Sequence, residues 1–109
     1  MDLQQTYREL LSMFYRDMDL HIGTGTKLTV GSSATRLHVT PISLSRACKQ
    51  LTGHPPKYLQ LHYTMQWAAE ELAFGATVST LYQQLGYANS KSFIRNYVRI
   101  IGTKPLDID

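Results

Sequence analysis

The sequence predicts an all-α protein built as two similar helical halves joined by a long helix. Three observations lead to this prediction. Apolar residues recur at intervals of three and four along most of the chain, as on one face of an amphipathic helix. Glycine and proline residues interrupt this pattern at several points. A segment of the first half also recurs in the second half, which indicates an internal repeat.

Six helices can be placed from the apolar pattern and from the residues that start and stop it. Thr29 and Thr40 are candidate N-caps, because their hydroxyl groups can accept hydrogen bonds from the first backbone N–H groups of a helix. Pro41 suits the first helical position, and Gly53 can adopt the left-handed conformation that ends a helix. The expected helices cover about residues 2–18, 30–38, 41–51, 57–74, 78–85 and 89–101.

Length, cysteine content and charge restrict the possibilities. The 109 residues suit one domain, and a single cysteine cannot form an internal disulfide bond. No signal sequence opens the chain and no apolar run reaches the roughly 20 residues that span a bilayer, so we expect a cytoplasmic protein without a membrane partner. Residues 27–106 carry nine Lys or Arg residues against two Glu, a net charge of +7, which favours a polyanionic partner such as nucleic acid.

The repeat relates two segments that each contain a short helix, a tight turn and a longer helix. A shift of 49 positions aligns Leu44 with Phe93, Arg46 with Arg95, Leu51 with Ile100, Gly53 with Gly102 and Pro56 with Pro105. A shift of 48 aligns the preceding short helices and places His38 on Gly86, where a left-handed backbone is expected. This unit is a helix-turn-helix, whose second helix can lie in the major groove of DNA.

The exposed faces of the two longer helices supply the candidate DNA contacts. Arg46 and Arg95 are predicted to read bases, because arginine can donate two parallel hydrogen bonds to guanine O6 and N7. The other predicted base contacts are Ile42, Ser45, Ser90, Lys91 and Ile94. The predicted phosphate contacts are Arg36, Thr40, Lys49, Asn89, Arg99 and Lys104.

Cys48 and His54 could suggest a metal site or a catalytic pair. A structural zinc site usually needs four ligands, and the sequence has no second cysteine. A catalytic pair would also need a group that orients the base. We therefore expect Cys48 to be a buried residue on a helix face, and we expect no metal, no cofactor and no catalytic residue. A small enzyme is the least favoured interpretation.

The repeated segments resemble the DNA-binding domain of AraC/XylS-type bacterial transcription regulators. The matching stretches are LHVTPISLSRACKQLTGHPP at 37–56 and GYANSKSFIRNYVRIIGTKP at 86–105, with the long helix between them. The resemblance implies about seven helices in a single domain over residues 1–109. It divides the chain into subdomain 1 at about 1–54, a linker helix at about 56–74 and subdomain 2 at about 75–106.

The same resemblance implies a function. It suggests a regulator of transcription, usually an activator that contacts RNA polymerase, whose two recognition helices enter successive major-groove segments of double-stranded DNA. A sensor or dimerisation domain is absent from this chain, so a stand-alone regulator and a piece of a longer one are both open. The alternative is a helix-turn-helix module that binds a protein, such as polymerase or another regulator, with weakened DNA binding.

The chain departs from the family pattern at several positions. Members commonly have alanine at Tyr82, phenylalanine at Tyr97, lysine at Val98 and an arginine near Thr64. The last two changes remove cations that are expected to contact phosphate, and each lost contact weakens binding. We therefore expect the second unit to be the weaker reader of DNA.

Overall fold

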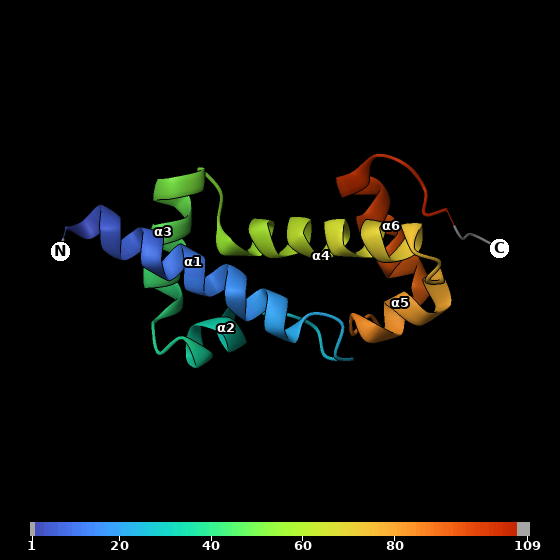
Figure 1. Ribbon diagram of the computed structural model, residues 1–109, viewed down its shortest axis with the longest axis horizontal. Coiled ribbons are helices and arrows are strands. Elements are labelled where there is room, and N and C mark those ends of the chain that lie inside the picture. Colours follow the sequence, from blue (N-terminus) through green and yellow to red (C-terminus); the bar gives the residue numbers. More distant parts are fainter. Residues whose placement is uncertain (1, 107–109) are drawn as a thin grey trace. The chain divides into compact units, whose positions relative to one another are not determined.

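The computed structural model describes residues 2–106, which form six α-helices and no strand (Figure 1). The helices are α1 (Leu3–His21), α2 (Val30–Arg36), α3 (Pro41–Thr52), α4 (Pro56–Ala73), α5 (Val78–Gln84) and α6 (Ser90–Ile101). The all-α prediction is confirmed. The number of helices differs slightly, because the described residues form six helices where the resemblance implies about seven. The first helix also continues to His21, three residues beyond its expected end.

The chain forms two compact units. Of the described residues, unit 1 contains 2–21 together with Leu28–Gln60, and unit 2 contains Ile22–Lys27 together with 61–106. These boundaries differ from the expected subdomains in two places. The connection between α1 and α2 belongs to unit 2, because Ile22 packs against the core of that unit. The beginning of α4 belongs to unit 1, where Leu59 is buried.

Unit 1 is formed by α1, α2, α3 and the start of α4. Helix α1 packs against both α2 and α3. The apolar side chains that this unit removes from solvent are Leu10, Phe14, Met18, Ala34, Leu44, Ala47, Cys48 and Leu59. These residues give unit 1 a hydrophobic core of its own. Full burial of one large apolar side chain stabilises a fold by about 1.5–3 kcal/mol.

Unit 2 is formed by the rest of α4 with α5 and α6. Its core contains Met65, Ala68, Leu72, Val78, Leu81, Leu85, Phe93 and Tyr97. The fully buried ring of Phe93 lies at the centre of an aromatic group, with ring centroids 5.8 Å from Tyr87 and 5.9 Å from Tyr97. Phe93 and Tyr97 both belong to α6 and share this core with residues of α4 and α5, so the buried face of α6 packs against those two helices.

The two units repeat the same helix caps. Thr29 and Thr77 begin the two short helices, and each side-chain oxygen accepts a hydrogen bond of 3.1 Å from the backbone N–H three residues later. Thr40 caps α3 in the same way, and Asn89 caps α6 through a hydrogen bond of 2.9 Å. The predicted caps at Thr29 and Thr40, the proline at the start of α3 and the left-handed Gly53 are confirmed.

The turn between the two helices is also repeated. His38 has φ 58° and Gly86 has φ 78°, so both residues adopt the predicted left-handed conformation. In each unit the residue after the turn donates its backbone N–H to a carbonyl five positions earlier, from Val39 to Ala34 at 3.0 Å and from Tyr87 to Tyr82 at 2.9 Å. These hydrogen bonds satisfy carbonyl groups that the end of a short helix leaves open. The sequence repeat is therefore a repeat of backbone geometry.

Candidate nucleic-acid interface

Helix α3 presents a basic surface on the side opposite its buried stripe. Leu44, Ala47 and Cys48 are buried, whereas Arg46 and Lys49 are exposed. Ile42 is 65% exposed and Ser45 is half-buried. Because residues four and three apart lie on one helix face, Ile42, Arg46 and Lys49 form one exposed row. The helix contains no acidic residue that could neutralise this row.

Helix α6 presents the matching surface in unit 2. Lys91, Arg95 and Arg99 are exposed at intervals of four, and Val98 lies beside them with 37% exposure. Ser90 at the helix start is half-buried. This helix also contains no acidic residue. Arg46 and Arg95 therefore occupy the same register on exposed basic helix faces in the two units.

Ile94 lies at the edge of this surface. The sequence pattern predicts it as a base contact. In the structure Ile94 is half-buried and packs against the core of unit 2. It lies one position before Arg95, at the edge of the buried face that Phe93 and Tyr97 form. Only part of the Ile94 side chain is left for a ligand, and packing accounts for the residue type.

Arg36 has a partner that the sequence did not reveal. Its Nε donates to Asp17 Oδ1 at 2.6 Å and its Nη2 donates to Asp17 Oδ2 at 2.8 Å. Asp17 is only 6% exposed and also accepts a hydrogen bond of 2.8 Å from Ser33, which in turn accepts one of 3.3 Å from Gln60. Arg36 therefore has a structural role that joins α2 to α1, and a phosphate contact by Arg36 would use only the part of its side chain that this pair leaves exposed. One signal could have suggested the partner: an aspartate stands next to Met18 on the apolar stripe of α1.

The same network changes the pKa of Asp17. Burial by itself would raise the pKa of this carboxyl group. The hydrogen bonds from Arg36 and Ser33, with the positive charges of Arg36 and His21, outweigh burial and hold the pKa of Asp17 below its usual value. The carboxylate is thus kept ionised and paired at the contact between α1 and α2.

The remaining predicted phosphate contacts are found at exposed positions. Lys49, Arg99 and Lys104 are exposed, and Arg99 donates a hydrogen bond of 3.4 Å to Asn96. The hydroxyl group of Thr40 is engaged with Ser43 as the cap of α3, accepting from its backbone N–H and donating to its side chain. Asn89 uses its side-chain oxygen as the cap of α6, and this bond does not involve its amide N–H groups.

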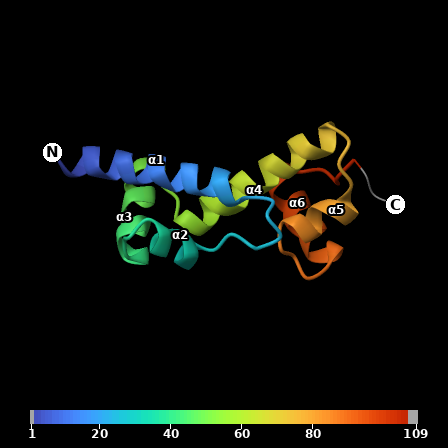
Figure 2. The same ribbon diagram turned by 60° about the horizontal axis from the view of Figure 1, so that its bottom comes forward.

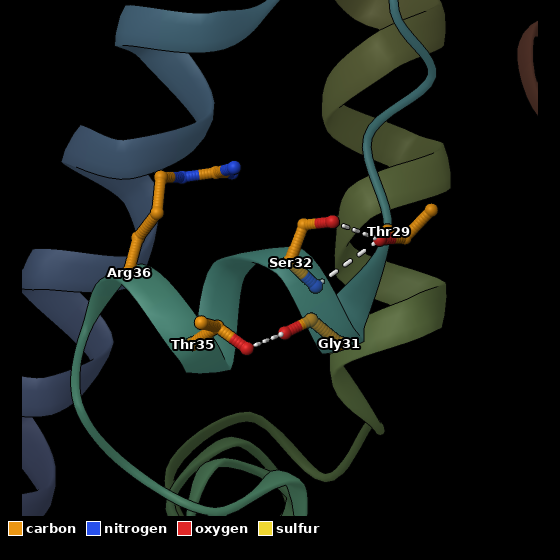
Figure 3. Close-up of a pocket in the computed structure, with 5 residues that line it drawn as sticks. All are labelled: Thr29, Gly31, Ser32, Thr35 and Arg36. Atoms are coloured by element: carbon orange, nitrogen blue, oxygen red, sulfur yellow. Dashed lines mark hydrogen bonds between the residues drawn. The ribbon is translucent and has the colours of Figure 1, made fainter.

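A hollow on α2 lies in unit 1 (Figure 3). It is lined by Thr29, Gly31, Ser32, Thr35 and Arg36. Thr29 donates its hydroxyl hydrogen to Ser32 at 2.8 Å, and Thr35 donates to the carbonyl oxygen of Gly31 at 2.9 Å. Figure 3 shows the side chain of Arg36 pointing away from Thr35. The hydroxyl groups of Thr29 and Thr35 therefore donate hydrogen bonds within α2 and its cap, and the Arg36 guanidinium group is bonded to Asp17.

Cys48 is confirmed as a buried residue on α3, with no exposed surface. Burial raises the pKa of the Cys48 thiol to about 11. Among residues 2–106 there is also no group of three histidine, cysteine, aspartate or glutamate side chains that could hold a metal ion. No helix in that range is both long and apolar enough to cross a membrane.

We expect a thiol reagent to label Cys48 very slowly in the folded protein at neutral pH. The thiolate is the reactive species, and a pKa of about 11 leaves on the order of one molecule in ten thousand ionised at pH 7. Labelling in guanidinium chloride should be fast, because unfolding exposes the thiol and restores its ordinary pKa. The measurement is the rate of modification in both conditions. Equal rates would contradict the burial of Cys48.

The two positions where cations are missing relative to the family pattern differ in their surroundings. Val98 lies on the exposed face with Arg95, so the lost lysine is a loss from the candidate interface itself. Thr64 is buried, with 9% exposure, in the middle of α4. In this chain a cation at position 64 would therefore be largely buried and would not lie on the surface.

Comparisons with known proteins agree with this geometry. Residues 33–108 match a family model described as "Helix-turn-helix domain", of the AraC type. Comparison with curated proteins yields no match. The structure is similar to the C-terminal domain of AraT, a response regulator from Geobacillus stearothermophilus, with a TM-score of 0.77 and 26% sequence identity over 88% of this chain and 79% of that one. The chain therefore belongs to the AraC-type helix-turn-helix family, whose members are DNA-binding transcription regulators.

Proposed function

We propose that the protein binds double-stranded DNA sequence-specifically and that α3 and α6 are its two recognition helices, which enter successive major-groove segments. The observation that carries the proposal is the repetition of an exposed basic helix face with arginine in the same register, Arg46 on α3 and Arg95 on α6. Each helix follows a short helix and a left-handed turn, as the recognition helix of a helix-turn-helix does. A planar guanidinium group that is held at the surface can pair with guanine O6 and N7.

The neighbouring side chains have different roles in this proposal. Ile42 offers an exposed apolar surface for a thymine methyl group, while Ser45, Ser90 and Lys91 can reach base edges. Ile94 contributes only the part of its side chain that packing leaves exposed. The predicted phosphate contacts are Arg36, Thr40, Lys49, Asn89, Arg99 and Lys104. Because the Arg36 guanidinium group is bonded to Asp17 and the Thr40 hydroxyl group to Ser43, the exposed Lys49, Arg99 and Lys104 supply most of these contacts in the proposal.

The first test replaces the two arginines. We expect Arg46→Ala and Arg95→Ala each to weaken binding to the preferred DNA site by about 1–3 kcal/mol, because each removes a two-bond base contact. Each variant should also lose discrimination at a few base pairs only. The preferred site is obtained by selection from random-sequence DNA, and affinity is measured by mobility-shift titration. Wild-type affinity in both variants would refute the assignment of the recognition helices.

Lys104→Ala is the matched control for these variants. Lys104 is exposed and follows α6. As a phosphate contact it should weaken binding to all sequences alike and lower the slope of log K against log salt by about 0.9. The arginine variants are thus distinguished from a general loss of positive charge.

The alternative function is a protein-binding module with weakened DNA affinity. The observation that favours it is the exposed Val98, at a position where the family commonly has a cation. However, α6 retains Lys91, Arg95 and Arg99 on its exposed face. The expectation that α6 binds DNA more weakly than α3 therefore depends on Val98 alone. The random-sequence selection separates the two functions, because a module that binds only protein should enrich no motif.

The proposal includes two partners that the family resemblance suggests. One is RNA polymerase, which the DNA-bound protein would contact as an activator. The other is a sensor or dimerisation domain, either in a longer chain or in another protein. The similar structure is the C-terminal domain of a response regulator, which supports a role as the DNA-binding part of a regulated protein. Recruitment is tested by adding RNA polymerase to the mobility-shift reaction on the selected site.

A further inference from the structure

The connection between α1 and α2 is built into unit 2, although both helices that flank it belong to unit 1. We call residues Ile22–Lys27 the strap. Ile22 packs against the core of unit 2, and a Cβ atom on Gly23 would lie 2.8 Å from the ring of Trp67. The N–H of Gly25 donates a hydrogen bond of 2.7 Å to the carbonyl of Gln84, at the end of α5. The strap therefore satisfies a carbonyl that a helix end leaves without a partner.

The strap also lies against the turn of the second helix-turn-helix. Figure 2 shows this connection beside the segment that joins α5 to α6. A Cβ atom on Gly86 would overlap the backbone nitrogen of Lys27 and lie 2.9 Å from its Cα. The equivalent turn in unit 1 has a side chain, His38, at nearly the same φ. The left-handed backbone alone therefore does not require glycine, and the close approach of the strap explains why position 86 has no side chain.

A chain of contacts leads from the strap to α6 through Tyr87. The Nζ atom of Lys27 lies 5.1 Å from the centroid of the Tyr87 ring, a distance at which a cation and an aromatic face attract each other. The hydroxyl oxygen of Tyr87 accepts a hydrogen bond of 2.9 Å from Asn96, and its ring meets the edge of Phe93. Asn96 and Phe93 belong to α6 and flank the Ile94–Arg95 pair in sequence.

We propose that the strap is a positioning element of the second DNA-reading unit. Through Gly86 and Tyr87 it holds the turn and the start of α6 in the orientation in which Arg95 meets the bases. The inference rests on the proposed function of α6. Lys27, Gly86 and Tyr87 are positioning residues, which act through α6. Base reading by the second unit thus depends on a segment that precedes the first helix-turn-helix in the chain.

The main test compares Gly86→Ala with Gly75→Ala. Both glycines have positive φ, 78° and 102°, so both variants share the strain of placing alanine there. A Cβ atom has no neighbour within 4 Å at Gly75 but collides with the strap at Gly86. On the selected DNA site, we expect Gly86→Ala to lose affinity about tenfold, comparable to Arg95→Ala, because a displaced α6 cannot form its base contacts. Gly75→Ala should stay within about threefold of the wild type.

Footprints and double variants show which unit is affected. Gly86→Ala should lose protection on the part of the site that Arg95→Ala also loses, and keep the part that depends on Arg46. The double variant Gly86→Ala with Arg95→Ala should bind only slightly more weakly than Arg95→Ala, because both changes remove the same contact. Full additivity, or a loss on the Arg46 side instead, would overturn the proposal.

A milder variant covers the case in which Gly86→Ala does not fold. Lys27 is exposed, so Lys27→Gln removes the cation above Tyr87 without disturbing the core. We expect a loss of about threefold confined to the Arg95 side, an unchanged salt slope, and recovery in Lys27→Arg. A salt slope lowered by about 0.9 would mean that Lys27 contacts phosphate, and this result would contradict a positioning role.

Amide hydrogen exchange, measured without DNA, tests the role of the strap independently of the proposed function. Gly86→Ala should speed exchange in α6 relative to Gly75→Ala and leave α3 unchanged, because the displaced strap belongs to unit 2. If Arg95→Ala binds DNA like the wild type, the proposed function of α6 fails, and exchange alone then decides the role of the strap. Wild-type exchange in Gly86→Ala would refute it.

Discussion

Asp17→Ala should lower the free energy of unfolding by about 2–3 kcal/mol, because it leaves Arg36 and Ser33 without their acceptor. Removing one partner of a fully buried ion pair costs about 3–5 kcal/mol. The cost here should be lower, since the Arg36 side chain is 35% exposed and can turn toward water. The measurement is equilibrium unfolding in guanidinium chloride. Glu9→Ala, at an exposed position of the same helix, is the control and should change stability by less than about 0.5 kcal/mol.

The contribution of Asp17 should also depend on pH in a defined direction. Its pKa is lowered in the folded protein, whereas an unfolded aspartate titrates near 3.9. The stabilisation is therefore complete above about pH 5, begins to fall near the unfolded pKa and disappears as the pH falls through the lower, folded pKa. The difference in stability between the wild type and Asp17→Asn should shrink in this acid range and stay constant near neutral pH. A difference independent of pH would show that the charge of Asp17 is not what stabilises the contact between α1 and α2.

Phe93→Ala should be the most destabilising single change in unit 2, with an expected loss of about 3–5 kcal/mol. Phe93 is fully buried and packs against the rings of Tyr87 and Tyr97. Truncation would leave a cavity at the point where α6 meets its own unit. Calorimetry and circular dichroism would measure the loss of stability. The expected functional consequence is loss of protection on the Arg95 side of the DNA site.

Leu44→Ala is the matched variant in unit 1, because Leu44 aligns with Phe93 in the repeat and is also fully buried. Its expected cost is about 2–5 kcal/mol. If the units unfold independently, each variant should lower the midpoint of one transition and leave the other in place, so that no single two-state free energy describes the protein. Equal shifts of a single transition would show instead that the two units unfold together. A change of less than about 1 kcal/mol in Phe93→Ala would contradict the packing of α6.

The candidate site could be predicted to different degrees at different residues. The exposure of Arg46, Lys91 and Arg95 is confirmed, because exposure on an amphipathic helix follows from the position of its apolar stripe. The partial burial of Ile94 was not predicted, because this residue lies at the border of that stripe, where a rotation of the helix decides between core and surface. Arg36 looked like any exposed cation on a short helix. Its partner Asp17 lies 19 positions earlier, and no local pattern connects the two residues.

The helices, their caps and the repeat of two helix-turn-helix units could all be predicted from the sequence. These features depend on interactions within a few residues, such as the cap at Thr40 and the left-handed turns at His38 and Gly86. The pairing of Arg36 with Asp17 and the place of the strap in unit 2 became apparent only in the folded chain. Such contacts join residues far apart in sequence, and whether these residues meet depends on how complete helices pack. Gly86 depends on both local and tertiary structure. Its positive φ is a local property, whereas the backbone of Lys27, 59 positions earlier, leaves no room for a side chain there.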